Sequence, residues 1–389
     1  MTTETGMLAI MRREFNRIFS SKICIWGMVV APVLSMFILI YMMNAGLPTK
    51  IPIAVVDLDN SSTSRALIRQ LDAFSKTDIK FKSVSFREAR ERMERAEVYG
   101  IYYIPKDFSK DAISGVQPKV SFYTNNAFLI SGSLLFQDLK TVSVLASAAV
   151  GLQMAEAKGI SERQIMPVLQ PIVVEAHPIS NPWLNYSIYL NNTLLPGILQ
   201  LVVILFTISS LGSEVKSGLG RKLVEMGGGS SWKILLGKML PYTFIFTLIA
   251  LLFMSVLYGY NKFPMNNGFL PMFLAYLLLI VSSQALGVIL LGVFPNYRFA
   301  LSAASLMGVL SFSISGVSFP VLSMNPMLQS LSIIFPLRHF FLIYVDQALN
   351  GIAFGYSAYK YVALLCFVFV SFFFYGRIKN FLYENEYED

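Results

Sequence analysis

Six apolar stretches of this chain are long enough to cross a membrane and contain no Asp, Glu, Lys, Arg or His. Most of them reach the roughly 20 residues that a helix needs to span the hydrocarbon core of a bilayer. A long polar block separates the first stretch from the other five. The predicted spans are residues 23–43, 193–212, 239–260, 269–294, 299–319 and 361–375. The sequence therefore predicts a polytopic α-helical membrane protein with six transmembrane helices and a polar domain inserted between helices 1 and 2.

The composition agrees with this class and the charge distribution orients the chain. Of 389 residues, 55% are hydrophobic and only 14% are charged, which is unlike a soluble domain. Outside the polar block, twelve Lys and Arg fall on one set of loops and three on the other. The positive-inside rule then places both termini in the cytoplasm and the polar block outside. We interpret the net charge of +8 as topological, so no nucleic-acid partner is expected.

The chemistry that is missing excludes several function classes. Transporters driven by ion gradients usually carry an ionisable residue at membrane depth, and the six stretches contain none. A secondary transporter is therefore disfavoured. The sequence has no phosphate-binding loop, and its two histidines are far apart and lack neighbouring cysteines. We expect no catalytic residues, no metal site and no cofactor bound by this chain.

The sequence also predicts the order of the domains. Residues 1–22 form a cytoplasmic interfacial helix, because residues 6–20 carry an apolar stripe opposite a basic face. Its alternative is a basic lead-in that only sets topology. A first helix at 23–44, a retained signal anchor, precedes an extracytoplasmic α/β domain with a stalk at 45–190. Helices 2–6 occupy 191–376, and the tail at 377–389 is cytoplasmic.

Within the α/β domain, short β-rich runs alternate with helical ones, and a long helical run at 128–157 is the expected stalk. The strands are expected at 51–57, 79–86, 98–104 and 119–124. Within the helix 2–6 region, the sizeable inner loop is 213–238. Residues 320–358 are too polar for a span but contain an apolar run broken by Pro336, which favours two short helices that dip into the outer leaflet.

Two segments carry a resemblance to a known family. The inner loop has an acidic and a basic residue, a glycine, leucines at helical spacing and a late glycine-lysine: Glu214, Lys216, Gly218, Leu219, Leu223, Gly237 and Lys238. The fifth span ends in SISGVSFPVLSMNP at 313–326, followed by PLRHF at 336–340. In these motifs, and in the order of its parts over nearly the whole chain, the sequence resembles the permeases of the ABC type-2 exporter family. The single outer domain is similar to that of the drug-export branch. One departure is that Gly220, Arg221 and Lys222 stand where the family often has Thr and an acidic residue.

The resemblance implies a membrane subunit that hydrolyses nothing itself. It would pair with a second permease copy, identical or related, and with separate cytoplasmic ATPases that bind ATP and Mg²⁺. A periplasmic adaptor and membrane lipids are further expected partners, and the location is the bacterial inner membrane. Residues 213–228 would form the coupling helix and residues 7–20 a lever beside it. The expected cargo is a hydrophobic or amphipathic compound such as a drug or a lipid.

The same resemblance assigns candidate roles to residues. The expected ATPase-coupling residues are Arg12, Glu14, Arg17, Glu214, Lys216, Gly218, Arg221, Lys222 and Glu225; their alternative role is topological charge and headgroup binding. The outer gate would contain Pro320, Pro326, Pro336, Arg338 and His339, which would otherwise form a structural plug. Polar residues inside the spans suggest a translocation path at Asn192, Gln200 and Gln284, although such groups also bridge helices.

A second function class stays open at this point. The chain would also fit a membrane-anchored extracytoplasmic sensor, or a scaffold that docks an adaptor while its spans conduct nothing. Charge reversal of Lys216, Arg221 and Lys222 separates the two hypotheses, because an exporter would lose coupling while a scaffold would keep its outer partner.

Overall fold

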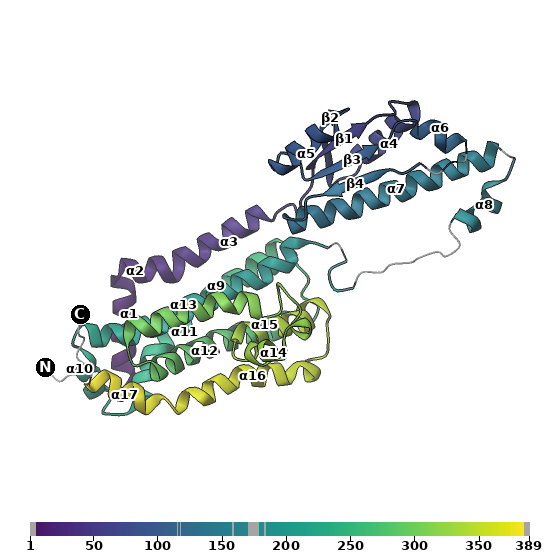
Figure 1. Ribbon diagram of the computed structural model, residues 1–389. Coiled ribbons are helices and arrows are strands. Elements are labelled where there is room, and N and C mark those ends of the chain that lie inside the picture. Colours follow the sequence, from purple (N-terminus) through teal and green to yellow (C-terminus); the bar gives the residue numbers. More distant parts are fainter. Residues whose placement is uncertain are drawn as a thin grey trace. The chain divides into compact units, whose positions relative to one another are not determined.

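The computed structural model describes residues 5–384 except 115, 117, 158, 170–178 and 183 (Figure 1). The chain divides into two compact units. A helical unit combines Met1–Gly46 with Pro178–Asp389, and an α/β unit comprises Leu47–His177. The α/β unit is thus inserted after the first long apolar helix, as the sequence predicts.

Six helices of the helical unit are long and apolar enough to cross a membrane, and each overlaps one of the six predicted spans. The first is α2 (Lys22–Ile25), a π-helical turn (Trp26–Val30) and α3 (Ala31–Met42) in succession. The others are α9 (Tyr186–Lys216), α11 (Ser231–Met254, continued by a π-helical turn at Ser255–Tyr260), α12 (Phe269–Val293), α13 (Tyr297–Ile314) and α16 (Phe354–Phe372). A seventh helix that passes the same test, α7 (Leu129–Ala157), belongs to the α/β unit.

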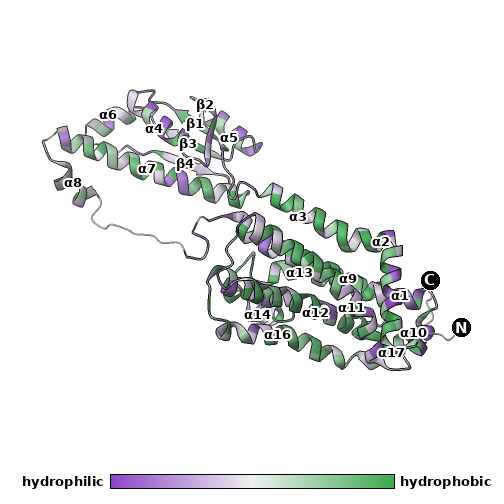
Figure 2. Cartoon of the chain, turned by 180° about the vertical axis from the view of Figure 1, so that it is seen from behind, coloured by the Kyte–Doolittle hydropathy of each residue, from purple (hydrophilic) through white to green (hydrophobic). Residues whose placement is uncertain are grey.

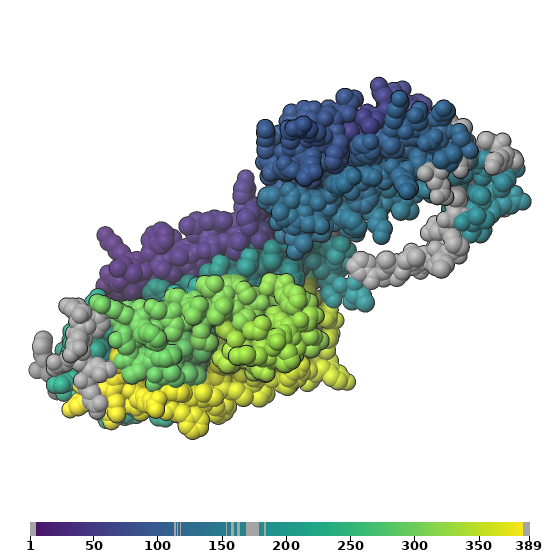
Figure 3. Space-filling model, viewed as in Figure 1, coloured from purple at the N-terminus to yellow at the C-terminus, as the bar shows by residue number. Residues whose placement is uncertain are grey.

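The core of the helical unit lies around α12. In the most apolar window of α12, 72% of residues are buried within the chain, against 17% in the first span. In Figure 2 the six helices are coloured as hydrophobic over most of their length, and many of their large apolar residues are exposed. In the space-filling view, α16 lies along the face shown in Figure 3, next to the green segments of α13 and α15. An apolar surface this extensive is typical of helices that face lipid or another chain.

Several helix ends differ from the predicted spans: α11, for example, begins at Ser231 rather than at residue 239, and α9 ends at Lys216 rather than at residue 212. α9 begins at Tyr186 rather than at residue 193, because Asn191 and Asn192 are buried against other helices and do not end it. α16 likewise begins at Phe354 rather than at residue 361. The fifth span was predicted to reach residue 319, but α13 ends at Ile314. The chain then bends through Gly316, whose φ of +96° is a conformation that favours glycine.

Two short helices occupy the segment that was predicted to break near Pro336. α14 (Pro326–Ser332) is followed by α15 (Pro336–Tyr344) and a π-helical turn (Val345–Leu349), and the two parts are bent by 85°. Both helices begin with proline, which suits the first helical turn because its missing N–H would have no partner there. The broken pair agrees with the sequence, and its depth in a membrane stays a prediction.

The α/β unit is built on a four-stranded sheet of order β2-β1-β3-β4. Strands β1 (Ile51–Asp57), β2 (Thr77–Ser83) and β3 (Gly100–Ile104) are parallel, and β4 (Ser121–Thr124) is antiparallel to β3. Helices α4 (Ser62–Asp72), α6 (Phe108–Ile113) and α7 pack on one face of the sheet and α5 (Phe86–Glu94) on the other. A further helix, α8 (Glu162–Leu169), follows α7.

Helix α7 forms a layer of the α/β unit along its first half. Leu135, Leu139 and Val142 are buried against the sheet, and the hydroxyls of Ser143 and Tyr102 lie 3.0 Å apart. These contacts explain why the sequence places so many apolar residues in a helix outside the six spans. Its role as a stalk stays a prediction.

Candidate functional site

A buried cluster of charges joins three elements at one end of the helical unit. The Nζ atom of Lys238, near the start of α11, donates to Oε1 of Glu14 and to Oε1 of Glu214, each at 2.7 Å. Glu14 lies in α1 (Met7–Ser20), and Glu214 lies in the last turn of α9. All three side chains are at most 1% exposed. One ammonium group therefore binds α1 and α9 to α11.

Two arginines of α1 complete the cluster. Arg17 donates to Oε1 of Glu214 at 3.0 Å and to the carbonyl of Ser210 at 3.4 Å, and it also contacts the hydroxyl of Ser213. Arg13 forms an ion pair with the second carboxylate oxygen of Glu214. Both arginines are partly exposed, so the cluster extends from the interior to the surface.

The cluster pairs opposite charges closely. Three cations surround two carboxylates, so neither buried carboxylate lacks a partner. Burial alone would lower the pKa of Arg17, but the electrostatic effects of Glu14, Tyr242 and Glu214 together raise that pKa above its usual value. Removing one partner from a buried ion pair typically costs about 3–5 kcal/mol, because the other charge stays buried.

The local sequence explains how α1 reaches this position. Ile10, Glu14 and Ile18 are its buried residues, spaced four apart on one helical face. The closest approach to α11 is at Gly237, where an added Cβ would lie 2.9 Å from Cβ of Ile10 and 3.1 Å from the carbonyl oxygen of Met7. Glycine before Lys238 thus permits the helix contact that brings Lys238 to Glu14.

The segment between α9 and α11 is a short helix held by glycine turns. Gly218, with φ of +67°, ends α9, and α10 (Gly220–Met226) follows directly. An added Cβ at Gly220 would meet the carbonyl oxygen of Leu382 at 2.1 Å, so this glycine admits the backbone of α17 (Tyr375–Glu384). This close packing gives a structural reason for Gly220 where the resembled family often has a larger residue.

A groove of about 520 Å³ lies between α1 and α10. Its lining residues are Ala9, Arg12, Arg13, Asn16, Leu219, Lys222 and Met226. The amide N–H of Gly6 donates to the carbonyl of Met226 at 2.8 Å and closes one end of the contact between the two helices. The groove combines three basic side chains with apolar ones, which suits a surface that carries both acidic and apolar groups.

The structure divides the nine predicted coupling residues into two groups. Glu14 and Glu214 are buried in the ion cluster, and Arg17 lies at its edge. The other six are exposed on α1, at the end of α9, on the turn after it or on α10: Arg12, Lys216, Gly218, Arg221, Lys222 and Glu225. The exposed group includes two residues of the groove, whereas the buried carboxylates contact the cations of the ion cluster.

The comparison with known families decides what this chain is. The family profile described as "ABC-2 family transporter protein" matches residues 22–376, which is most of the chain. The chain belongs to the ABC-2 transporter family. No curated protein matches it significantly. As the membrane subunit of such a transporter, it is a multi-pass protein, and the ion cluster lies where α1 meets the segment that the sequence identified as the coupling loop.

At the other end of the helical unit of this ABC-2 protein, α15 is tied to the end of α13. Arg338 donates to the carbonyl of Ser315 at 3.0 Å, and an added Cβ on Gly316 would lie 2.5 Å from its Nη1. His339 Nε2 lies 2.9 Å from the carbonyl oxygen of Ile333. Pro326 and Pro336 begin α14 and α15, and Pro320 precedes a 3₁₀ turn at Val321–Ser323. The five predicted gate residues therefore surround one broken helix pair.

The three predicted path residues of the transporter are buried between its helices. Asn192 accepts from the hydroxyl of Tyr258 at 2.8 Å, and Gln284 accepts from that of Thr243 at 2.9 Å. Gln200 is 1% exposed, and neither amide atom has a hydrogen-bond partner among the described residues. Two of the three therefore bridge helices, and Gln200 retains its hydrogen-bonding capacity.

Several charged residues that the structure places in ion pairs of the ABC-2 protein were not predicted from the sequence. Lys238 was counted as a loop charge because the apolar run starts at Met239. Arg13 was counted as a charge that only sets the topology. Asp346 and Lys360 form a buried ion pair, and Ser357 donates to Asp346 at 2.6 Å. The burial of Glu14 could have been predicted from its spacing of four residues from Ile10 and from Ile18, which places it on the apolar face of α1. No comparable pattern in the sequence predicts the pair of Asp346 and Lys360.

Proposed function

We propose that this chain is the membrane-spanning subunit of an ATP-driven exporter, which moves a hydrophobic or amphipathic compound such as a drug or a lipid out of the cytoplasm or the inner membrane. ATP and Mg²⁺ bind to a separate ATPase subunit. The inserted α/β unit lies outside the cytoplasm, and both termini lie inside it. The basic inner loops and the uncharged stretches of the spans support this arrangement.

The observation that carries the proposal is the buried cluster of Lys238, Glu14 and Glu214. The groove between α1 and α10 is the docking surface for the ATPase, and the cluster joins α1 to α9 and α11, two of the spans. A displacement of α1 by the ATPase therefore reaches both spans at once, because a buried ion pair that loses a partner is costly. Glu14 and Glu214 act through this connection rather than by touching the ATPase.

A second copy of the chain completes the transporter in this proposal. In the most apolar windows of the first span, α13 and α16, only 17%, 28% and 28% of residues are buried within the chain, and a partner copy would cover part of the remaining surface. The cargo path runs past Asn192, Gln200 and Gln284, and the broken pair of α14 and α15 gates its outer end. The unpartnered amide of Gln200 is the group best suited to a polar atom of the cargo.

The test is ATP hydrolysis by the purified chain with and without the ATPase encoded beside it. The chain alone is expected to hydrolyse no ATP, and the complex in nanodiscs is expected to show hydrolysis that cargo stimulates. Hydrolysis by the isolated chain would refute the proposal.

Charge reversal of the exposed inner cations tests the coupling surface. The triple variant Lys216→Glu, Arg221→Glu, Lys222→Glu is expected to abolish stimulation of the ATPase while the chain still inserts in the membrane. Lys262→Glu, an exposed cation on a loop at the other end of the spans, is the control and is expected to retain it. A triple variant that keeps full stimulation, with the α/β unit still capturing a periplasmic partner, would favour the scaffold instead.

A further inference from the structure

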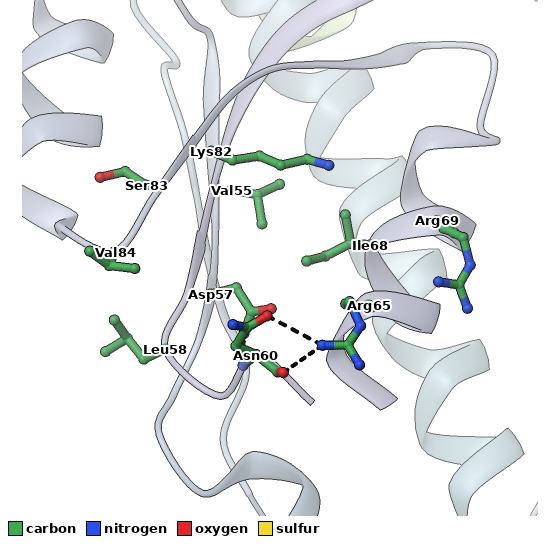
Figure 4. Close-up of a pocket in the computed structure, with 10 residues that line it drawn as sticks. All are labelled: Val55, Asp57, Leu58, Asn60, Arg65, Ile68, Arg69, Lys82, Ser83 and Val84. Atoms are coloured by element: carbon green, nitrogen blue, oxygen red, sulfur yellow. Dashed lines mark hydrogen bonds between the residues drawn. The ribbon is translucent and has the colours of Figure 1, made fainter. Parts of the chain in front are cut away.

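A pocket of about 950 Å³ opens at the carboxyl ends of strands β1 and β2, under helix α4 (Figure 4). Its lining residues are Val55, Asp57, Leu58, Asn60, Arg65, Ile68, Arg69, Lys82, Ser83 and Val84. Its volume lies within the range of roughly 300–1,000 Å³ that is usual for small-molecule sites. The carboxyl edge of parallel strands is also where open α/β sheets generally bind ligands.

A bulge in strand β2 directs Lys82 into this pocket. The pairing with β1 shifts between Ile53 and Ala54, which pair with Ile79 and Phe81 and leave Lys80 as the extra residue. Because side chains alternate between the two faces, one extra residue moves every later side chain to the opposite face. Lys82 therefore pairs with Val55 on the face that α4 covers, and in Figure 4 it points towards the helix that carries Arg69.

The charges of the pocket leave two cations available for a ligand. Asp57 is already satisfied, since it accepts from the amides of Asp59 at 3.0 Å and Asn60 at 2.9 Å and from the hydroxyl of Ser64 at 2.7 Å. Arg65 donates to the carbonyl of Asn60 at 2.7 Å. Among the described residues, the side chains of Arg69 and Lys82 have no hydrogen-bonded or ion-paired partner.

Four apolar side chains also line the pocket: Val55, Leu58, Ile68 and Val84. Val55 and Ile68 are buried at 1% and 8% exposure, and Val84 is 77% exposed. The pocket thus offers two unpaired cations beside an apolar wall. That combination is complementary to a molecule with an anionic head and a short apolar group.

We propose that this pocket is a binding site for a phosphate monoester with an apolar substituent. Arg69 and Lys82 hold the phosphate, and Val55 and Ile68 contact the apolar group. The inference concerns binding by the α/β unit and does not rest on the proposed export function. The same phosphate chemistry occurs in a free solute and in a lipid headgroup, and the experiment below distinguishes these two sources.

The test is calorimetric titration of the full chain, in nanodiscs of zwitterionic lipid, with hexyl phosphate. Inorganic phosphate and hexanol are the reference ligands, and empty nanodiscs supply the blank. Hexyl phosphate is expected to bind with one site per chain and about tenfold or more tightly than either reference, because it alone makes both the charged and the apolar contacts. Its affinity is expected to fall as salt is added.

Matched variants assign the binding to the pocket. The double variant Arg69→Gln, Lys82→Gln is expected to weaken hexyl phosphate binding by about tenfold or more, since each cation donates a charge-assisted hydrogen bond. Lys80→Gln removes a charge from the same strand but outside the pocket, where Lys80 pairs with Asp78, and is expected to leave the affinity unchanged. Arg69→Lys with Lys82→Arg keeps both charges and is expected to retain most of the binding.

Three results would overturn the proposal. They are the absence of hexyl phosphate binding, equal affinity for hexyl phosphate and hexanol, and equal losses in the Lys80 control and in the double variant. A repeat in nanodiscs that contain phosphatidic acid assigns the source. If the lipid headgroup occupies the pocket, hexyl phosphate binds more weakly in those discs. If a free solute is the natural ligand, the affinity for hexyl phosphate is the same in both kinds of disc.

Discussion

The Nζ atom of Lys238 lies 2.7 Å from Oε1 of Glu14, although 224 positions separate the two residues in the chain. This contact connects the amphipathic helix α1 to the start of α11, and the same Nζ atom binds Glu214 at the end of α9. Burying this ion pair requires both charges to lose their hydration, which costs free energy on folding. Once it is formed, removal of either partner leaves a buried charge unpaired, so the three helices are held together strongly. A cluster of this kind is well suited to make α1, α9 and α11 move as one body.

Double-mutant analysis of Glu14 and Lys238 tests this connection. We predict that Lys238→Met destabilises the chain by about 3–5 kcal/mol, because Arg17, at 3.8 Å, is then the one charged partner of Glu14 among the described residues. The double variant Glu14→Leu, Lys238→Met is expected to recover much of this loss, since Leu continues the stripe between Ile10 and Ile18. Thermal unfolding in detergent measures both effects. Additive losses in the double variant would contradict a direct interaction.

Gly237 tests the close approach of α1 and α11. Gly237→Ala places a Cβ against the backbone-proximal atoms of Ile10 and the carbonyl of Met7, and overpacking of this kind costs about 1–3 kcal/mol. We expect a lower unfolding temperature and weaker stimulation of the partner ATPase. Gly376→Ala is the matched control, because an added Cβ there meets nothing within 4 Å. An unchanged Gly237→Ala protein would show that the two helices are free to separate.

The sequence predicted the six spans because uninterrupted apolar residues are required wherever a helix faces lipid. It could not place the charges at the ends of these helices. Lys238 and Lys360 lie just before the residues where the apolar runs begin, and hydropathy assigns such positions to loops. Their burial depends on the partners Glu14 and Asp346, which lie on other elements, and a single sequence does not reveal such pairings.

In the α/β unit, too, the sequence predicted a feature that depends on neighbouring residues but not one that depends on the pairing of distant segments. Strand β1 at 51–57 was predicted correctly, since its run of Ile and Val is typical of a buried parallel strand. The bulge at Lys80 was not predicted, because the alternating pattern of 79–86 reads equally well without it. That bulge decides which lysine faces the pocket.

The ion pair between Asp346 and Lys360 is a second place where charge removal has a specific expected result. Asp346→Asn leaves Lys360, whose side chain is 9% exposed, without its counter-charge, and we predict a loss of about 3–5 kcal/mol. Asp346→Leu with Lys360→Met is expected to be more stable than either single variant, as apolar replacements of buried pairs often are. Lys262→Met, at an exposed position, is the control for chemical denaturation. A double variant less stable than both singles would contradict the expectation.

Gly316 tests how α15 is attached to α13. Gly316→Ala forces a Cβ into a φ of +96° and to within 2.5 Å of Arg338 Nη1, so the hydrogen bond from Arg338 to Ser315 is expected to break. We predict faster hydrogen exchange in α14 and α15, with the six long helices unaffected. Gly355→Ala, where an added Cβ meets nothing within 4 Å, should exchange like the wild type. Equal exchange in both variants would argue against Gly316 as the attachment point.

The most direct test of the whole account is the side of the membrane on which each unit lies. In a chain with Cys24→Ala and Cys366→Ala, single cysteines replace Ser217, which is exposed after α9, or Val84, which is exposed at the pocket of the α/β unit. A membrane-impermeant thiol reagent is then applied to intact spheroplasts. We predict labelling at position 84 and none at position 217 until the membrane is opened. Labelling at position 217 in sealed spheroplasts would place the coupling segment outside the cell and contradict the proposed delivery of force from a cytoplasmic ATPase.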